Sequence, residues 1–170
     1  MLRTRMRFVF VALLVSSFVA ATPQADLAQG DWHHPRRDYS VESLRGDYAA
    51  VATYGANVAR ALGTQTLDGV GNLKGSAIVN QPGLNGARTI VSITFTGTYT
   101  VNSDGTGTMS LTIMLPNGKT ANATEDFVIT KAKILGGIPI ATEIIDAQEQ
   151  PSTVIPGGVF VTHTYTRRSE

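Results

Sequence analysis

Residues 89–115 read TIVSITFTGTYTVNSDGTGTMSLTIML, and this stretch decides the fold. Apolar side chains alternate with serine and threonine from residue 91 to residue 101, and the alternation returns after residue 108. A period of two is typical of a β-strand with one buried and one solvent-facing side. Between the two runs, Asn102-Ser103-Asp104-Gly105 has the composition of a tight turn. The stretch therefore predicts a β-hairpin.

Similar runs continue on both sides of this hairpin. The further predicted strands cover residues 44–54, 57–67, 73–81, 120–130 and 158–166. Residues 138–147 are ambiguous, because their β-branched alternation favours a strand while the composition of residues 141–150 leaves a short helix as the alternative. With that segment taken as a strand, the count is eight, linked mostly by short turns.

Consecutive hairpins in a chain of 170 residues favour a closed architecture. An antiparallel up-and-down barrel removes the exposed edges that an open sheet would leave. We therefore predict an all-β fold, a small antiparallel up-and-down barrel of about eight strands. An open two-sheet sandwich is the competing architecture.

The N-terminus has the pattern of a signal peptide. Arg3, Arg5 and Arg7 precede an apolar run over residues 8–19, and small residues follow up to Ala21. A membrane-spanning helix needs roughly 20 apolar residues, more than this run supplies. We predict a signal peptide over residues 1–21, with Ala25 as a second cleavage position, and export to the periplasm or the extracellular space. A flexible leader is predicted over residues 22–43 and the barrel domain over residues 44–170, with no membrane span after cleavage.

Charge and cysteine content exclude several classes of function. The full chain has 14 basic and 13 acidic residues, and removal of the three signal-peptide arginines leaves 11 against 13. This mildly acidic balance lacks the basic field of a nucleic-acid binder, so we predict no nucleic-acid partner. The absence of cysteine excludes disulfides, thiolate nucleophiles and cysteine metal sites.

Two segments contain residues that occur in metal sites, but neither meets the requirements of such a site. His33-His34 lies in the predicted leader, where neighbouring side chains of an extended chain point in opposite directions. In a calcium loop aligned on Gly105, Leu111 occupies the position that requires a bidentate glutamate. The sequence therefore predicts no metal, no cofactor and no catalytic residue set.

Polar residues within the inward-facing phase are the candidate ligand-binding residues. In the last strand His163 and Tyr165 share a phase with Val161, and Glu125 shares one with Phe127. The predicted set is completed by three interior aromatic residues, so that it consists of Tyr48, Phe95, Tyr99, Glu125, His163 and Tyr165. A carboxylate, an imidazole and phenols inside an apolar barrel resemble the sparse polar groups of a ligand pocket. The alternative is that these groups satisfy one another's hydrogen bonds, because small eight-stranded barrels can fill their interiors with side chains.

Several motifs together resemble a group of uncharacterised exported bacterial proteins. These motifs are LRGDY at 44–48, LDGVGN at 67–72, FTGTYTVN at 95–102 with DGTG at 104–107, and DFVI at 126–129. The resemblance covers roughly residues 44–166, and the chain departs from it in a longer region at 134–156 and a longer leader. It implies a calycin-like barrel similar to those of lipocalins and of the allene oxide cyclase type. It supplies no catalytic motif.

The first functional hypothesis is an exported, non-catalytic barrel that holds a small apolar ligand in its lumen. A cyclase-like or isomerase-like enzyme using Glu125, His163 and interior tyrosines is the second, and a filled barrel acting as a structural or interaction module is the third. A lumen of roughly 300 Å³ or more would favour the first two. Convergence of Glu125 and His163 on one empty volume would support the enzyme.

Overall fold

The computed structural model describes residues 38–56, 58–155 and 158–168. The predicted signal peptide and His33-His34 lie outside the described residues. Eight strands and two single-turn 3-10 helices follow one another in the described part. They are η1 (Val41–Ser43), β1 (Arg45–Tyr54), β2 (Ala59–Asp68), β3 (Asn72–Pro82), η2 (Leu84–Gly86), β4 (Arg88–Val101), β5 (Thr106–Met114), β6 (Thr120–Leu135), β7 (Ile138–Gln148) and β8 (Val161–Arg167).

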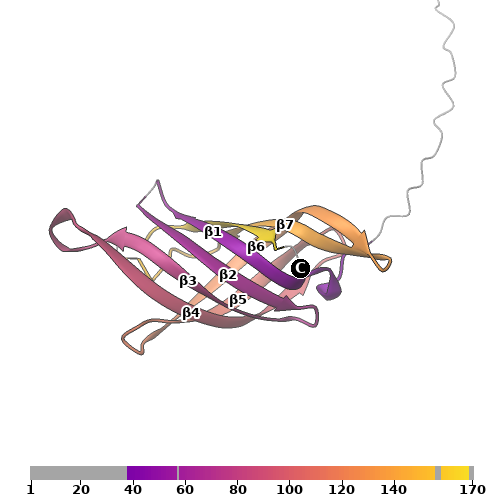
Figure 1. Cartoon of the computed structure of the whole chain (residues 1–170), viewed down its shortest axis with the longest axis horizontal. Helices are drawn as coiled ribbons and strands as arrows, with labels where there is room; N and C mark the ends of the chain where they lie inside the picture. Colours follow the sequence, from indigo (N-terminus) through magenta and orange to yellow (C-terminus); the bar gives the residue numbers. More distant parts are fainter. Residues whose placement is uncertain (1–37, 57, 156–157, 169–170) are drawn as a thin grey trace, which may run out of the picture. The chain divides into compact units, whose positions relative to one another are not determined.

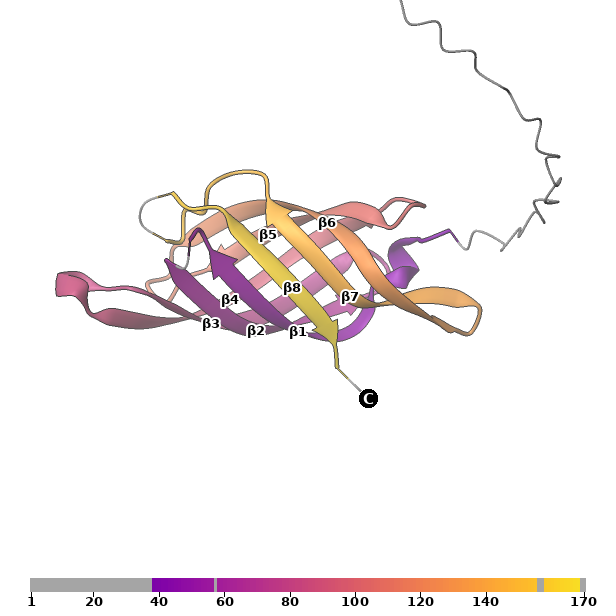
Figure 2. The ribbon, with the colours of Figure 1, turned by 90° about the horizontal axis from the view of Figure 1, so that it is seen from above.

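The eight strands close into a barrel. Each strand pairs antiparallel with the next along the chain, and β8 pairs with β1 to complete the cylinder (Figures 1 and 2). At the seam Val51 of β1 lies opposite Leu62 of β2 on one side and Thr164 of β8 on the other. The predicted all-β, up-and-down barrel is confirmed, and the sandwich alternative is wrong.

The ambiguous segment is a strand. β7 pairs with β6 on one side and β8 on the other, so its backbone groups are used in two ladders. A register shift near Lys131 and Glu143 interrupts the β6–β7 ladder, as a β-bulge does. The strand prediction for this segment is confirmed, although β6 runs on to Leu135 and β8 begins only at Val161.

The Asp-Gly turns have the chemistry that their sequences indicate. Oδ1 of Asp68 accepts hydrogen bonds from the backbone N–H groups of Val70 (2.8 Å) and Asn72 (2.9 Å). In the next such turn, the backbone N–H of Thr106 donates to Oδ1 of Asp104 (3.0 Å). Gly105 has a φ of +88°, which glycine adopts without a steric penalty. The carboxylate of Asp104 thus serves the β4–β5 turn.

One end of the barrel is closed by η1 and by a tyrosine. The hydroxyl of Tyr99 accepts a hydrogen bond from the backbone N–H of Gly69 (2.8 Å) and donates to the carbonyl of Leu44 (2.7 Å). Leu44 and Ser43 are fully buried there. The backbone N–H of Tyr39 also donates to the carbonyl of Ser103 (3.1 Å), so residues 39–43 of the predicted leader contact the barrel.

The inner face of the strands forms the hydrophobic core. Its fully buried members include Met109, Ile144 and Val161, which come from β5, β7 and β8. Exposed and buried residues alternate along most strands, as the period-two pattern predicted. Among the residues described, no helix has the length and hydropathy that crossing a membrane requires.

Candidate functional site

Three neighbouring strands bring four polar side chains together inside the barrel. Glu125 comes from β6, Asp146 from β7, and His163 and Tyr165 from β8. Asp146 lies directly opposite His163 in the β7–β8 ladder, and Glu125 lies opposite Gln148, two residues beyond Asp146. Cross-strand and diagonal neighbours on one face of a sheet are within side-chain reach. Strand register therefore builds the cluster.

His163 and Asp146 form the tightest pair in this cluster. Nδ1 of His163 lies 2.8 Å from Oδ1 of Asp146, and the backbone N–H of His163 donates to the same oxygen at 2.9 Å. The two bonds hold the carboxylate and the imidazole ring in a fixed relation. Oδ2 of Asp146 is buried and has no hydrogen-bond partner among the described residues.

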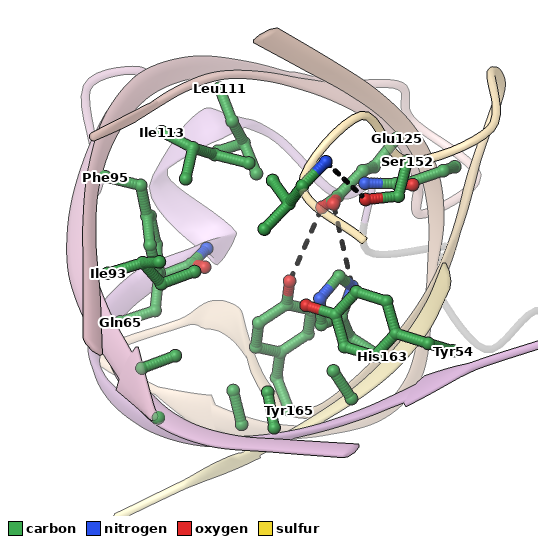
Figure 3. Close-up of a pocket in the computed structure, with 17 residues that line it drawn as sticks. Tyr54, Gln65, Ile93, Phe95, Leu111, Ile113, Glu125, Ser152, His163 and Tyr165 are labelled. Carbon is green, nitrogen blue, oxygen red and sulfur yellow. Dashed lines mark hydrogen bonds and ion pairs between the residues drawn. The ribbon is translucent and has the colours of Figure 1, made fainter. Parts of the chain in front are cut away.

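Glu125 completes the cluster from β6, the strand that pairs with β7. Its Oε1 lies 3.6 Å from Nδ1 of His163, and the hydroxyl of Tyr165 donates to its Oε2 at 3.5 Å (Figure 3). Both distances are long for hydrogen bonds. Because the residue is only 1% exposed, the carboxyl group of Glu125 is buried with loose partners.

Burial and mutual charge shift the pKa values of the three groups. Burial raises the pKa of Glu125 to about 8, with the charge of His163 opposing this shift and that of Asp146 adding to it. Burial alone would raise the pKa of Asp146, but the hydrogen bond and charge of His163 outweigh it and lower the pKa. Burial alone would lower the pKa of His163, but the hydrogen bond and charge of Asp146, together with the charge of Glu125, raise it. The hydrogen bond and charge shared by Asp146 and His163 thus favour the ionised form of Asp146, and burial favours the neutral form of Glu125 at neutral pH.

A small cavity adjoins this cluster at the end of the barrel opposite η1. The space open to the centre of a water molecule is about 40 Å³, enough for roughly three waters. Glu125, His163 and Tyr165 line one side. On β1, β2 and β3 the residues that line the cavity are small, namely Ala50, Ala52, Ala61, Gly63 and Ala77. The cavity exists because these positions carry almost no side-chain volume.

Gln65 faces the acidic cluster from β2, and Figure 3 shows it across the lumen from Glu125. It is 1% exposed, and its Nε2 makes only a 3.5 Å contact with the sulfur of Met109. Its Oε1 has no partner among the described residues. A buried amide oxygen without a partner costs free energy that a ligand or a water can recover.

The loop after β7 crosses the mouth of this end. Ser152 and Val154 line the cavity, and Ile155 is 1% exposed. The backbone N–H of Ser152 donates to the carbonyl of Val159 (2.8 Å), and that of Val154 donates to Oγ of Ser152 (3.2 Å). These contacts hold Ser152 and Val154 within the loop between β7 and β8.

Four of the six predicted site residues converge on the cavity, namely Phe95, Glu125, His163 and Tyr165. The two others point inward at different places. Tyr48 donates its hydroxyl hydrogen to the carbonyl of Ala141 (2.9 Å), and Tyr99 closes the η1 end. These two tyrosines belong to the core and do not line the cavity.

The sequence interpretation missed Asp146, Gln65 and Ser152. Asp146 follows Ile144 by two residues, so the alternation of β7 already placed it inside. Gln65 likewise precedes the buried Leu67 by two residues. Ser152 lies in a loop and had no periodic signal. Extending the alternation to every strand end would have found the first two.

The arrangement suits two kinds of chemistry. Carboxylates and an imidazole with shifted pKa values can exchange protons with a bound molecule. The ligand atoms of Glu125, Asp146 and His163 also lie within 4.8 Å of one another, close enough for the three to contact one metal ion.

Comparison with known proteins adds little to this description. No family model matches the chain, and no curated protein matches it. The chain is similar to a solved structure described as a redesigned beta barrel, with 14% identity and a TM-score of 0.47 over 76% of this chain and 95% of that one. The closed barrel agrees with the fold that the resemblance to exported bacterial proteins implied, while no family match supports the resemblance itself.

Proposed function

We propose that the protein is a binding barrel that takes a small ligand into the lumen beneath residues 149–155. One observation carries the proposal. The cavity has an apolar wall of alanine and glycine on one side and Glu125 with His163 on the other, and the buried Oε1 of Gln65 beside it lacks a partner among the described residues. An apolar pocket with a few convergent polar groups is the usual form of a ligand site.

The size of the cavity limits the ligand. Its 40 Å³ is far below the roughly 300 Å³ that would favour an open ligand lumen, so the volume alone favours the filled-barrel hypothesis. The proposed ligand is therefore a compact molecule, and anything larger requires the lining side chains to move. An apolar body fits the alanine wall, and a hydroxyl group fits Gln65 and Glu125.

Acid–base catalysis is the second candidate. Glu125 and His163 converge on the same empty volume, as the enzyme hypothesis requires. A carboxyl group with a pKa of about 8 is protonated at neutral pH and can act as a general acid. The proposed reaction class is a proton-transfer isomerisation or cyclisation of a compact substrate. Its support is narrower than that for binding, because it depends on the protonation of Glu125 as well as on the shape of the cavity.

The binding proposal is tested by solution NMR with phenol and with toluene, in buffer containing EDTA. The two probes have nearly the same shape and, with seven heavy atoms each, both require the cavity to widen beyond the room for roughly three waters. Only phenol carries a hydroxyl group for Gln65 and Glu125. We expect saturable shifts at the amides of Gln65 and His163, with phenol binding about tenfold more tightly, as one additional hydrogen bond allows. Absence of binding by both probes would favour the filled-barrel hypothesis.

A matched pair of variants locates the site. Ala52→Leu adds three carbons on the inner face of β1, where Ala52 lines the cavity. Ala49→Leu makes the same change on the exposed face of the same strand. We expect Ala52→Leu to abolish phenol binding and Ala49→Leu to leave it unchanged. Equal binding by the two variants contradicts a lumen site.

We also propose that the protein acts after export, in the periplasm or outside the cell. The support is the signal-peptide pattern of residues 1–21. N-terminal sequencing of the protein from its own cells is expected to start at Thr22, or at Asp26 if cleavage follows Ala25. A protein that retains Met1 contradicts export by cleavage.

A further inference from the structure

We infer that Glu125, Asp146 and His163 form a binding site for one divalent transition-metal ion, with Zn²⁺ as its representative. The inference goes beyond the proposed ligand site, since it depends on Asp146, which does not line the cavity, and needs no organic ligand. It rests on the geometry of three donor atoms, on the charge they bury and on an unused carboxylate oxygen.

The donor atoms are already near the separations that a metal imposes. Nδ1 of His163 lies 3.6 Å from Oε1 of Glu125 and 2.8 Å from Oδ1 of Asp146. Tetrahedral coordination at about 2.0–2.1 Å sets neighbouring donors about 3.3 Å apart. The Glu125 separation is close to this value, and the Asp146 separation has to open by about half an ångström. Relative to the neutral metal-free cluster, in which His163 and Glu125 each carry an additional proton, Zn²⁺ binding would release both protons to solvent.

The charge of the cluster favours a divalent cation. Two ionised carboxylates buried beside a neutral imidazole carry a charge of −2, which one divalent ion neutralises. Without an ion, neutrality requires protons on His163 and Glu125. Buried charges are costly unless they are paired or bound to a metal. A cation is therefore the group that satisfies both carboxylates together.

Buried oxygen atoms around the three donors leave acceptor capacity that an ion could use. The side chain of Asp146 is 0% exposed, yet its Oδ2 has no hydrogen-bond partner in the described part of the chain. The buried Oε1 of Gln148, which lies opposite Glu125 in the β6–β7 ladder, also has none there. Native proteins rarely leave such atoms unsatisfied. Rotation of the Asp146 carboxylate toward an ion would use both of its oxygens.

The donor set selects the class of metal. Two carboxylate oxygens and one imidazole nitrogen suit Zn²⁺ and its first-row neighbours, whereas Ca²⁺ takes six to eight oxygens. The backbone N–H of His163 already fixes Oδ1 of Asp146, as outer contacts of metal ligands commonly do. Because Glu125 and His163 line the cavity, a fourth position faces a space with room for water.

The test uses the full chain carrying His33→Ala and His34→Ala, which removes the paired leader histidines as a competing site. The chain has three histidines, so His163 is then the only one left. After EDTA treatment, Zn²⁺ is titrated by calorimetry, and the ring-nitrogen resonances of His163 are followed by NMR. We expect one Zn²⁺ per chain and a shift of the Nδ1 resonance. If the variant without His33 and His34 no longer binds Zn²⁺, the inference is wrong. It is also wrong if the Nδ1 resonance of His163 does not move during the titration.

Two further variants in the same background assign the ligands. Glu125→Gln keeps the size of the side chain and removes its charge, whereas Asp126→Asn does the same at the adjacent outward-facing position. We expect Glu125→Gln to weaken Zn²⁺ binding by about 100-fold or more and Asp126→Asn to leave it unchanged. Equal affinities overturn the inference. Phenol binding is measured in EDTA and Zn²⁺ binding without phenol, so either proposal can fail while the other stands.

Discussion

Glu125 and His163 make the stability of the metal-free barrel depend on pH in one direction. The pKa of Glu125 is raised from 4.5 to about 8, so its stabilising contribution is complete below pH 4.5 and is lost as pH rises through 8. The pKa of His163 is also raised, so its contribution is complete below pH 6.5 and is lost above its folded pKa. The lowered pKa of Asp146 acts oppositely, and its contribution is lost only as pH falls below 3.8.

We therefore predict that stability falls between pH 5 and pH 8 in the presence of EDTA. At about 1.4 kcal/mol per pKa unit, the loss is on the order of a few kcal/mol. Urea unfolding at several pH values measures it. Glu125→Gln, which cannot ionise, should flatten most of the slope, whereas Asp126→Asn should retain it. A slope unaffected by Glu125→Gln would contradict the assignment of the pH dependence to this carboxyl group.

The same residues show what alternation along a strand can predict. Period two reports whether a side chain faces inward, and it correctly placed Glu125, His163 and Tyr165 inside the barrel. It does not report depth along the barrel axis, which is set by strand register. Tyr48 and Tyr99 were therefore grouped with the site although they lie elsewhere. The partnership of Asp146 with His163 is likewise a property of the β7–β8 ladder.

At the scale of elements, Tyr99 ties β4 to the β2–β3 turn and to the segment before β1. Tyr99→Phe removes the group that accepts the N–H of Gly69 and donates to the carbonyl of Leu44. Leaving these groups unpaired should destabilise the barrel by about 1–3 kcal/mol. Hydrogen exchange should show faster exchange at the amide of Gly69. Tyr48→Phe removes a different hydroxyl and should leave that amide unchanged; equal Gly69 protection in both variants would contradict this role.

Two turns that each contain a glycine with positive φ provide a second comparison. Gly105 and Gly118 both have positive φ, +88° and +76°. A Cβ at Gly105 would lie 2.9 Å from the ring of Tyr39, whereas one at Gly118 would meet nothing within 4 Å. Gly118→Ala should cost about 1–2 kcal/mol for the left-handed backbone alone, and Gly105→Ala should cost more. Equal losses in urea unfolding would show that Tyr39 does not pack against the β4–β5 turn.

Most strands could be predicted from the local sequence, because the alternation of apolar and polar residues agreed with the turn residues between the strands. Asp68 and Asp104 precede glycines with positive φ and also accept the hydrogen bonds of their turns. β7 was harder, since residues 141–150 are rich in helix-forming types. The segment is a strand because it pairs with β6 on one side and β8 on the other. Such long-range pairing overrides the local preference for a helix.

For the molecule as a whole, the cavity is the property least accessible to sequence. It arises where Ala52, Ala61 and Gly63 from neighbouring strands come to the same depth opposite Glu125. No one of these residues signals a hollow by itself. The volume depends on the sum of side chains across the lumen, which is defined only once the barrel has closed.

Closure also makes β8 the strand on which the fold and the site both depend. Thr164 faces outward between Val51 of β1 and Ile145 of β7, and its neighbours His163 and Tyr165 face the cavity. Thr164→Pro removes a ladder N–H and introduces a ring into a strand paired on both sides, which should cost about 3 kcal/mol or more. Thr164→Ala keeps the backbone bond and should change stability by less than about 1 kcal/mol.

Because a closed barrel has no edge strand, the loss in Thr164→Pro should be shared by all eight strands. Far-UV circular dichroism and tyrosine fluorescence should then shift to the same lower urea midpoint, and phenol binding should weaken with them. A proline variant as stable as Thr164→Ala would mean that β8 does not close the barrel. Separate midpoints would mean that the seam opens alone, leaving β1 to β7 folded without the strand that carries His163.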